Sequence, residues 1–152
     1  MDLHFEIATS EDTETLITFI REYYAYDKHP FDEAALRPAL DAIVREPAFG
    51  RVWLIQDGDL AIGYVVLTLG YSLEYLGRDA FVDELYVRES HRGQGVGARA
   101  LAFVEDVCRQ LGVRALHLEV ERENTRAYYL YSKSGFRDQQ RYLMTKRIAP
   151  SE

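Results

Sequence analysis

Three glycines alternate with other residues in HRGQGVGARAL, residues 91–101. Gly93, Gly95 and Gly97 stand directly before a segment of helical periodicity that runs to Leu111. Glycine adopts positive φ angles and lets a ligand approach the backbone closely. The free N–H groups and the positive dipole end of a helix N-terminus attract anions. The segment therefore predicts a turn that binds a phosphate group.

Three interpretations of this turn are open. The simplest is a structural turn, because a short glycine pattern of this kind occurs by chance in about one chain in ten of this size. The second is a dinucleotide fingerprint, since Gly93, Gly95 and Ala98 have the G-x-G-x-x-A spacing. The later ribose acid would then be Glu119 or Glu121, but the connection of five residues before Gly93 is longer than such a turn requires. A P-loop is excluded because no Gly-Lys-Ser/Thr follows.

The third interpretation is a resemblance to a known family. Residues 92–97, RGQGVG, resemble the acyl-coenzyme A pyrophosphate loop of the GNAT superfamily of N-acetyltransferases. The preceding strand VDELYV and the following segment LHLEVERENTRAYYLYSKSGF extend this resemblance. Five residues there match the second signature of the superfamily in order and spacing: Asn124, Ala127, Tyr131, Gly135 and Phe136. We adopt this interpretation because a structural coincidence would have to occur twice, in the right order.

The resemblance implies an α/β fold of the GNAT type, with a mixed, mostly antiparallel sheet of about six to seven strands and about four helices. Strands are expected in HFEIA, in both arms of RVWLIQDGDLAIGYVVLTLGYS, and in DAFVDELYVRE, RALHLEVE and YLMTKRI. Helices are expected in TSEDTETLITFIREYYAYD, over residues 32–44 and 95–111, and in NTRAYYLYSKS. Residues 81–120 form the one β-α-β crossover, and residues 1–152 form a single domain.

The resemblance also assigns a binding site for acetyl-CoA. The pantetheine arm is expected in a V-shaped opening between residues 81–87 and 116–120, along the backbone of Leu85, Tyr86 and Val87. The pyrophosphate is expected on the N–H groups of Gly93, Gln94, Gly95, Val96, Gly97 and Ala98. Arg92 adds a positive charge there. Asn124, Ala127 and Tyr131 complete the predicted cofactor site.

Tyr131 is the predicted general acid, because attack of an amine on a thioester expels a thiolate that needs a proton. Transfer from a tyrosine of pKa near 10 to a thiolate near 8.5 is uphill by about 2 kcal/mol, which a positioned hydrogen bond offsets. The amine must lose a proton first, and the gap between an alkylammonium near 10.4 and a glutamate near 4.3 is about 8 kcal/mol. A carboxylate that acts through water is therefore expected. Glu84 and Asp83, on opposite faces of one strand, are the candidates, with Glu119 third.

Aromatic and acidic residues are the candidates for the amine pocket. They are Tyr24, Asp27, Phe31, Tyr71 and Glu74, with Tyr23, Tyr26 and Tyr75 from the same segments. An aromatic and acidic rim suits a small cation, although each residue suits packing equally well. The expected activity is transfer of an acetyl group from acetyl-CoA to a primary amine, by direct attack in a ternary complex. A small-molecule substrate is favoured over a protein or peptide amine. A non-catalytic acyl-CoA-binding module with the same fold is the alternative.

Composition excludes several other functions. The net charge of −7, from 25 acidic and 18 basic side chains, opposes non-specific binding of nucleic acid. The single Cys108 leaves no internal disulfide and no cysteine zinc cluster, and no metal is expected. No stretch reaches the roughly 18 apolar residues of a membrane span, and MDLHFEIATSED lacks the features of a signal peptide. We expect a cytoplasmic protein without a membrane partner, and a homodimer is an open alternative.

Overall fold

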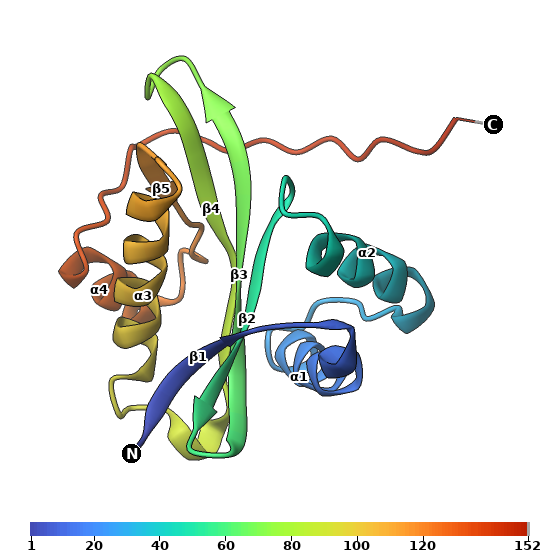
Figure 1. Cartoon of the computed structure of the whole chain (residues 1–152). Helices are drawn as coiled ribbons and strands as arrows, with labels where there is room; N and C mark the ends of the chain where they lie inside the picture. Colours follow the sequence, from blue (N-terminus) through green and yellow to red (C-terminus); the bar gives the residue numbers. More distant parts are fainter. Residues whose placement is uncertain (152) are drawn as a thin grey trace.

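A five-stranded sheet lies at the centre of the molecule (Figure 1). The computed structural model describes residues 1–151. The strands are β1 (Leu3–Ile7), β2 (Gly50–Asp57), β3 (Leu60–Ser72), β4 (Gly77–Val87) and β5 (Ala115–His117), and they lie in the sheet in that order. The pairs from β1 to β4 are antiparallel, whereas β5 is parallel to β4. The mostly antiparallel α/β fold with one parallel crossover is thus confirmed.

Four α-helices cover the two faces of the sheet. They are α1 (Thr13–Tyr26), α2 (Glu33–Arg45), α3 (Val96–Gln110) and α4 (Thr125–Lys133), and short 3-10 turns span Ser10–Asp12 and Glu89–His91. Helices α1 and α2 lie on one face, and α3 and α4 lie on the other (Figure 1). Leu16, Phe19 and Ile20 of α1 pack in the first core, and Leu101 and Val104 of α3 pack in the second. The apolar positions at helical spacing therefore build one core on each face.

The helix boundaries follow from local capping. Asp32 Oδ1 accepts a hydrogen bond from Ala35 N at the start of α2. Asn124 Oδ1 accepts one from Ala127 N at the start of α4. These side chains satisfy N–H groups that lack a partner within the helix. Gly112, with φ of +72°, follows the end of α3.

A bulge interrupts the pairing of β3 with β4. Val66 lies opposite Glu84, but the next residue of β3, Leu67, lies opposite Val82. Asp83 is therefore the extra residue of β4. A bulge bends its strand and redirects the neighbouring side chains, so the strict alternation expected around Asp83 and Glu84 does not hold here.

Strands β4 and β5 separate soon after they meet. Their register runs from the pair Asp79–Ala115 to the pair Phe81–His117, whereas β4 continues to Val87. The strand expected over residues 114–121 therefore ends early, because no strand pairs with its outer edge. The outer edge of β4 beyond Phe81 is open where the pantetheine arm is expected.

The C-terminal segment corrects one prediction. YLMTKRI does not form a strand, residues 136–151 have no sheet partner, and the C-terminal end extends away from the body of the molecule (Figure 1). Tyr142 and Met144 are 84% and 88% exposed. The sheet accordingly has five strands rather than six or seven, because apolar residues in a segment do not by themselves supply a neighbouring strand. Among residues 1–151, every helix is too short or too polar to cross a membrane.

Candidate active site

The glycine turn has the conformation that an anion site requires. Gly93 and Gly95 have φ angles of +72° and +82°, in the region that favours glycine. Helix α3 begins at Val96 without a side-chain cap, so its first N–H groups have no partner within the helix. A Cβ atom placed on Gly95 would meet nothing within 4 Å. This open helix N-terminus fits the pyrophosphate of a coenzyme A ligand.

Arg126 lies beside the same turn, and sequence reasoning did not select it. Its Nη2 atom would lie 3.5 Å from a Cβ atom on Gly93. Arg126 forms no ion pair with any acid among residues 1–151. Arg126 could have been predicted from its position two residues after Asn124, because the resemblance already places the start of that helix at the cofactor. The guanidinium group is thus placed to bind a phosphate.

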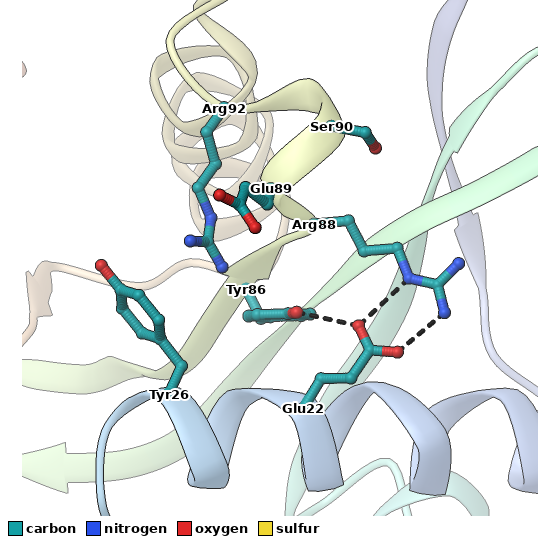
Figure 2. A pocket seen from close by; sticks show the side chains of 7 residues that line it. All are labelled: Glu22, Tyr26, Tyr86, Arg88, Glu89, Ser90 and Arg92. Atoms are coloured by element: carbon teal, nitrogen blue, oxygen red, sulfur yellow. Dashed lines mark hydrogen bonds and ion pairs between the residues drawn. The ribbon is translucent and has the colours of Figure 1, made fainter.

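The side chain of Arg92 points toward Tyr26 and Tyr86 (Figure 2). Its Nε donates a hydrogen bond of 2.8 Å to Val87 O. Its guanidinium carbon lies 4.5 Å from the ring centroid of Tyr26 and 5.6 Å from that of Tyr86. Arg92 therefore holds the turn against β4 and α1, and its contact with phosphate stays a prediction. The Val87 carbonyl, one of the groups predicted to bind pantetheine, is already hydrogen-bonded.

A network around Glu22 joins α1 to the end of β4 (Figure 2). Glu22 Oε1 accepts hydrogen bonds from Tyr86 Oη at 2.9 Å and Arg88 Nε at 3.1 Å. Glu22 Oε2 accepts one from Arg88 Nη2 at 2.7 Å. The Arg88 guanidinium lowers the pKa of Glu22, despite an opposing contribution from burial. These groups line an open cavity of about 530 Å³ with Tyr26, Glu89, Ser90 and Arg92.

Both carboxylate oxygens of Glu84 accept hydrogen bonds from tyrosine hydroxyls. Tyr24 Oη on α1 lies 2.6 Å from Glu84 Oε2, and Tyr64 Oη on β3 lies 2.7 Å from Glu84 Oε1. Burial raises the pKa of Glu84; the two hydroxyls offset part of this effect, and the charge of Asp83 adds to it. Glu84 thus faces α1 and is held in a fixed position.

Asp83 is exposed, but its charge reaches the same region. Burial is the main cause that raises the pKa values of Tyr23 and Tyr24, and the charges of Glu84 and Asp83 raise them further. The two carboxylates therefore act on one group of tyrosines. The third candidate base, Glu119, lies beyond the end of β5 and lines a hollow that Tyr131 of α4 also lines.

Tyr131 approaches this region from α4. Its ring packs edge-on against Phe136, with centroids 6.2 Å apart. Burial raises the pKa of Tyr131, and the charge of Asp27 at the end of α1 raises it further. No hydrogen bond ties its hydroxyl to another group among residues 1–151. The hydroxyl therefore keeps its proton and is free to donate it.

The predicted amine-binding residues divide into two groups. Asp27 Oδ2 pairs with His29 Nε2 at 2.8 Å, and the ring of Phe31 packs edge-on against Tyr24 with centroids 6.2 Å apart. Tyr24, Asp27 and Phe31 thus gather around Glu84 and Tyr131. Tyr71 is 76% exposed, and Glu74 pairs with Arg141 at 2.6 Å. No hydrogen bond, ion pair or ring contact among residues 1–151 joins these two to the first group.

Comparison with known proteins identifies the family. The model of the Acetyltransferase (GNAT) family matches residues 13–136. The chain is 26% identical over 141 residues to an aminoalkylphosphonate N-acetyltransferase of Salmonella typhimurium, across 93% of this chain and 88% of the relative. It is 30% identical over 144 residues to a thialysine N-epsilon-acetyltransferase of Sus scrofa, across 86% and 82%. The chain therefore belongs to the GNAT family and is an N-acetyltransferase that depends on acetyl-CoA.

Solved structures confirm the fold. An integron cassette protein from the mobile metagenome of Cole Harbour Salt Marsh is 37% identical, with a TM-score of 0.85 over 97% of this chain and 91% of that chain. An aminoglycoside N-acetyltransferase in complex with CoA has a TM-score of 0.82 at 15% identity, over 97% and 95%. The GNAT fold predicted from the glycine turn and the second signature is confirmed.

Proposed function

We propose that this enzyme acetylates a small primary amine by direct attack in a ternary complex. The proposal is supported by a candidate base, Glu84 on β4, and a candidate acid, Tyr131 on α4, that lie near the same amine-binding candidates. Both have raised pKa values. A base for the amine and an acid for the leaving thiolate are what direct transfer requires. The presence of both also opposes the alternative of a non-catalytic acyl-CoA-binding module.

Each residue then has a distinct role. Bound acetyl-CoA supplies the thioester carbonyl and the thiolate leaving group. The glycine turn and Arg126 bind its phosphates, and the backbone of Leu85 and Tyr86 orients its pantetheine arm. Tyr131 Oη donates a proton to the leaving sulfur. Glu84 is the base, and Asp83, exposed beside it, attracts the cationic substrate.

The charge around the site favours an amine that carries a second positive charge. Asp27, Asp83 and Glu84 contribute negative charge, and the charge of Asp83 disfavours ionisation of Glu84. A dication relieves this repulsion, whereas a phosphonate adds to it. Aminoalkylphosphonate and thialysine, which appear in the names of two relatives, differ in the groups that they carry away from the reacting amine. For this chain we propose that the preferred substrate is a diamine.

The net charge and the single cysteine indicate which partners and which location suit the protein. The net charge of −7 opposes binding to nucleic acid or to an anionic membrane surface. Cys108 is a buried free thiol, and burial raises its pKa to about 11, which is compatible with the reducing cytoplasm that we propose as the location. We also propose a homodimer, since the apolar side chains of Leu143, Met144 and Ile148 are exposed in the single chain.

Initial-rate kinetics test direct transfer. Acetyl-CoA and 1,4-diaminobutane are varied together, and thiol release is followed. Direct attack in a ternary complex predicts double-reciprocal lines that intersect, and an intact mass unchanged after incubation with acetyl-CoA alone. Parallel lines together with an acetylated protein would instead establish a covalent intermediate.

A further inference from the structure

The hydrogen bonds around Glu84 limit the routes by which a proton can reach this carboxylate. Each of its oxygens already accepts a hydroxyl hydrogen, from Tyr24 on one side and Tyr64 on the other. Tyr64 is completely buried between β2 and β4. Tyr24 is only partly buried, at the end of α1 that faces the amine region. Of the two hydroxyls that contact Glu84, only that of Tyr24 is therefore accessible from the amine region.

We propose that the Tyr24 hydroxyl is the group that takes the proton from the substrate amine and passes its own proton to Glu84. This inference rests on the proposed function and names the contact through which the base acts. One ammonium N–H bond breaks as a bond forms to Tyr24 Oη, and the original Oη–H bond breaks as Glu84 Oε2 gains the proton. The amine keeps the electron pair with which it attacks, and no redox partner is needed. Glu84 later returns the proton to solvent through the same hydroxyl.

The geometry of Tyr24 suits such a relay. The 2.6 Å separation from Glu84 Oε2 is typical of a charge-assisted O–H···O⁻ bond. The ring is held edge-on by Tyr23, His29 and Phe31, with centroids 5.9, 6.0 and 6.2 Å away. The hydroxyl proton is thus already directed at the carboxylate before the amine arrives. Such fixed positioning removes part of the reorganisation that proton transfer would otherwise require.

The groups around Glu84 keep the relay in the required protonation state. Tyr24, Tyr23 and His29 face it from α1 and the loop after it, Tyr64 faces it from β3, and Asp83 is its neighbour on β4. Burial and the Glu84 carboxylate raise the pKa of Tyr24, so its hydroxyl always has a proton to pass. Burial brings the pKa of Glu84 closer to that of an amine. Both effects act in the direction that the relay needs.

A pair of matched substitutions separates a relay from a simple positioning role. Tyr24→Phe and Tyr64→Phe each remove one hydroxyl from Glu84, but only Tyr24 can contact the substrate. With 1,4-diaminobutane at pH 8, we expect Tyr24→Phe to lower kcat at least about 100-fold and Tyr64→Phe less than about tenfold. Thermal unfolding of both variants is the control that they are folded. Equal losses in the two variants would overturn the relay.

An amine that needs no deprotonation gives an independent readout. 2,2,2-Trifluoroethylamine is neutral at pH 8, so its attack does not require the relay. The rate ratio between wild type and Tyr24→Phe should fall from about 100 to below about 10 with this amine. Glu84→Gln, which retains the Tyr24 hydroxyl, should show the same rescue. An undiminished ratio would overturn the relay. A wild type that acetylates neither amine would overturn the proposed function itself, and the relay with it.

Discussion

At the residue scale, the roles that we propose for Glu84 and Tyr131 involve protons that move in opposite directions. Glu84 must be ionised to accept a proton, and Tyr131 must be protonated to donate one. Burial raises the pKa of both groups. The same environment therefore makes Glu84 a stronger base and keeps Tyr131 in its acid form.

Replacement of the general acid should affect kcat far more than binding. Tyr131→Phe removes the proton donor for the thiolate, so we expect kcat to fall about 100-fold or more, with little change in KM for acetyl-CoA. Tyr128→Phe is the matched control, because Tyr128 is 46% exposed on the same helix. Steady-state thiol release measures both variants. Equal rates for wild type and Tyr131→Phe at all pH values would remove Tyr131 as the acid.

The pH profile should report the interaction between two neighbouring acids. Activity should rise as pH increases through the pKa of Glu84, which burial raises above the usual range of a glutamate. The charge of Asp83 contributes to this elevation, so Asp83→Asn should move the acidic limb of kcat/KM to lower pH. A limb that stays in place, or moves to higher pH, would contradict this assignment of the base.

Much of the site follows from local sequence, and part of it does not. Gly95 and Asn124 were predicted because a helix start has local requirements that single residues meet. The orientation of Glu84 depends on a bulge, which strand alternation does not reveal. The Tyr64 hydrogen bond and the position of Arg126 are contacts between elements, and no local pattern encodes them. Tyr71 and Glu74 were selected by residue type alone, and no hydrogen bond, ion pair or ring contact joins them to Tyr24, Asp27 and Phe31 among residues 1–151.

At the element scale, the separation of β4 from β5 and the position of α1 shape the site. Helix α1 is tied to β4 by Glu22 at one point and by Tyr24 at another. The ends of the helices agree with the expected ranges to within a few residues, because caps and apolar periodicity are local signals. The length of β5 was not predictable, since a strand extends only where another strand pairs with it.

The Glu22 network should contribute measurable but modest stability. Arg88 lowers the pKa of Glu22, so the ionised form favours the folded state, and this contribution is present above about pH 4.5 and is lost as pH falls. Because the side chain of Glu22 is still 33% exposed, Glu22→Gln should lower stability by at most about 1 kcal/mol at pH 7, or about 2–4 °C in Tm. Thermal unfolding at pH 7 and pH 3 measures this. A difference that grows at pH 3 would contradict the assignment.

At the scale of the whole molecule, the C-terminal segment is the part whose apolar side chains remain exposed in the single chain. Residues 142–148, YLMTKRI, were expected to form a strand, yet the apolar side chains of Leu143, Met144 and Ile148 are exposed. Within residues 1–151, no strand lies beside the outer edge of β5. An unpaired edge and an unpaired apolar segment in one chain are both suited to association.

The homodimer can be tested by removal of this segment. We expect the full chain to sediment as a dimer at micromolar concentration, and a chain that ends at Gln140 to sediment as a monomer with unchanged helix content. The reason is that burial of the exposed apolar side chains of residues 142–148 drives association. A monomeric full chain would contradict the dimer, and a dimeric truncated chain would place the interface elsewhere.

The acetylation of a diamine tests the central claim most directly. The measurement compares kcat/KM for 1,4-diaminobutane and 2-aminoethylphosphonate by thiol release with acetyl-CoA, and mass spectrometry identifies the acetylated amine. The acidic surroundings of Glu84 predict a diamine preference of at least about 100-fold, which corresponds to about 2.7 kcal/mol. Equal or faster acetylation of the phosphonate would contradict the proposed substrate class. Release of thiol without an acetylated amine would contradict the activity.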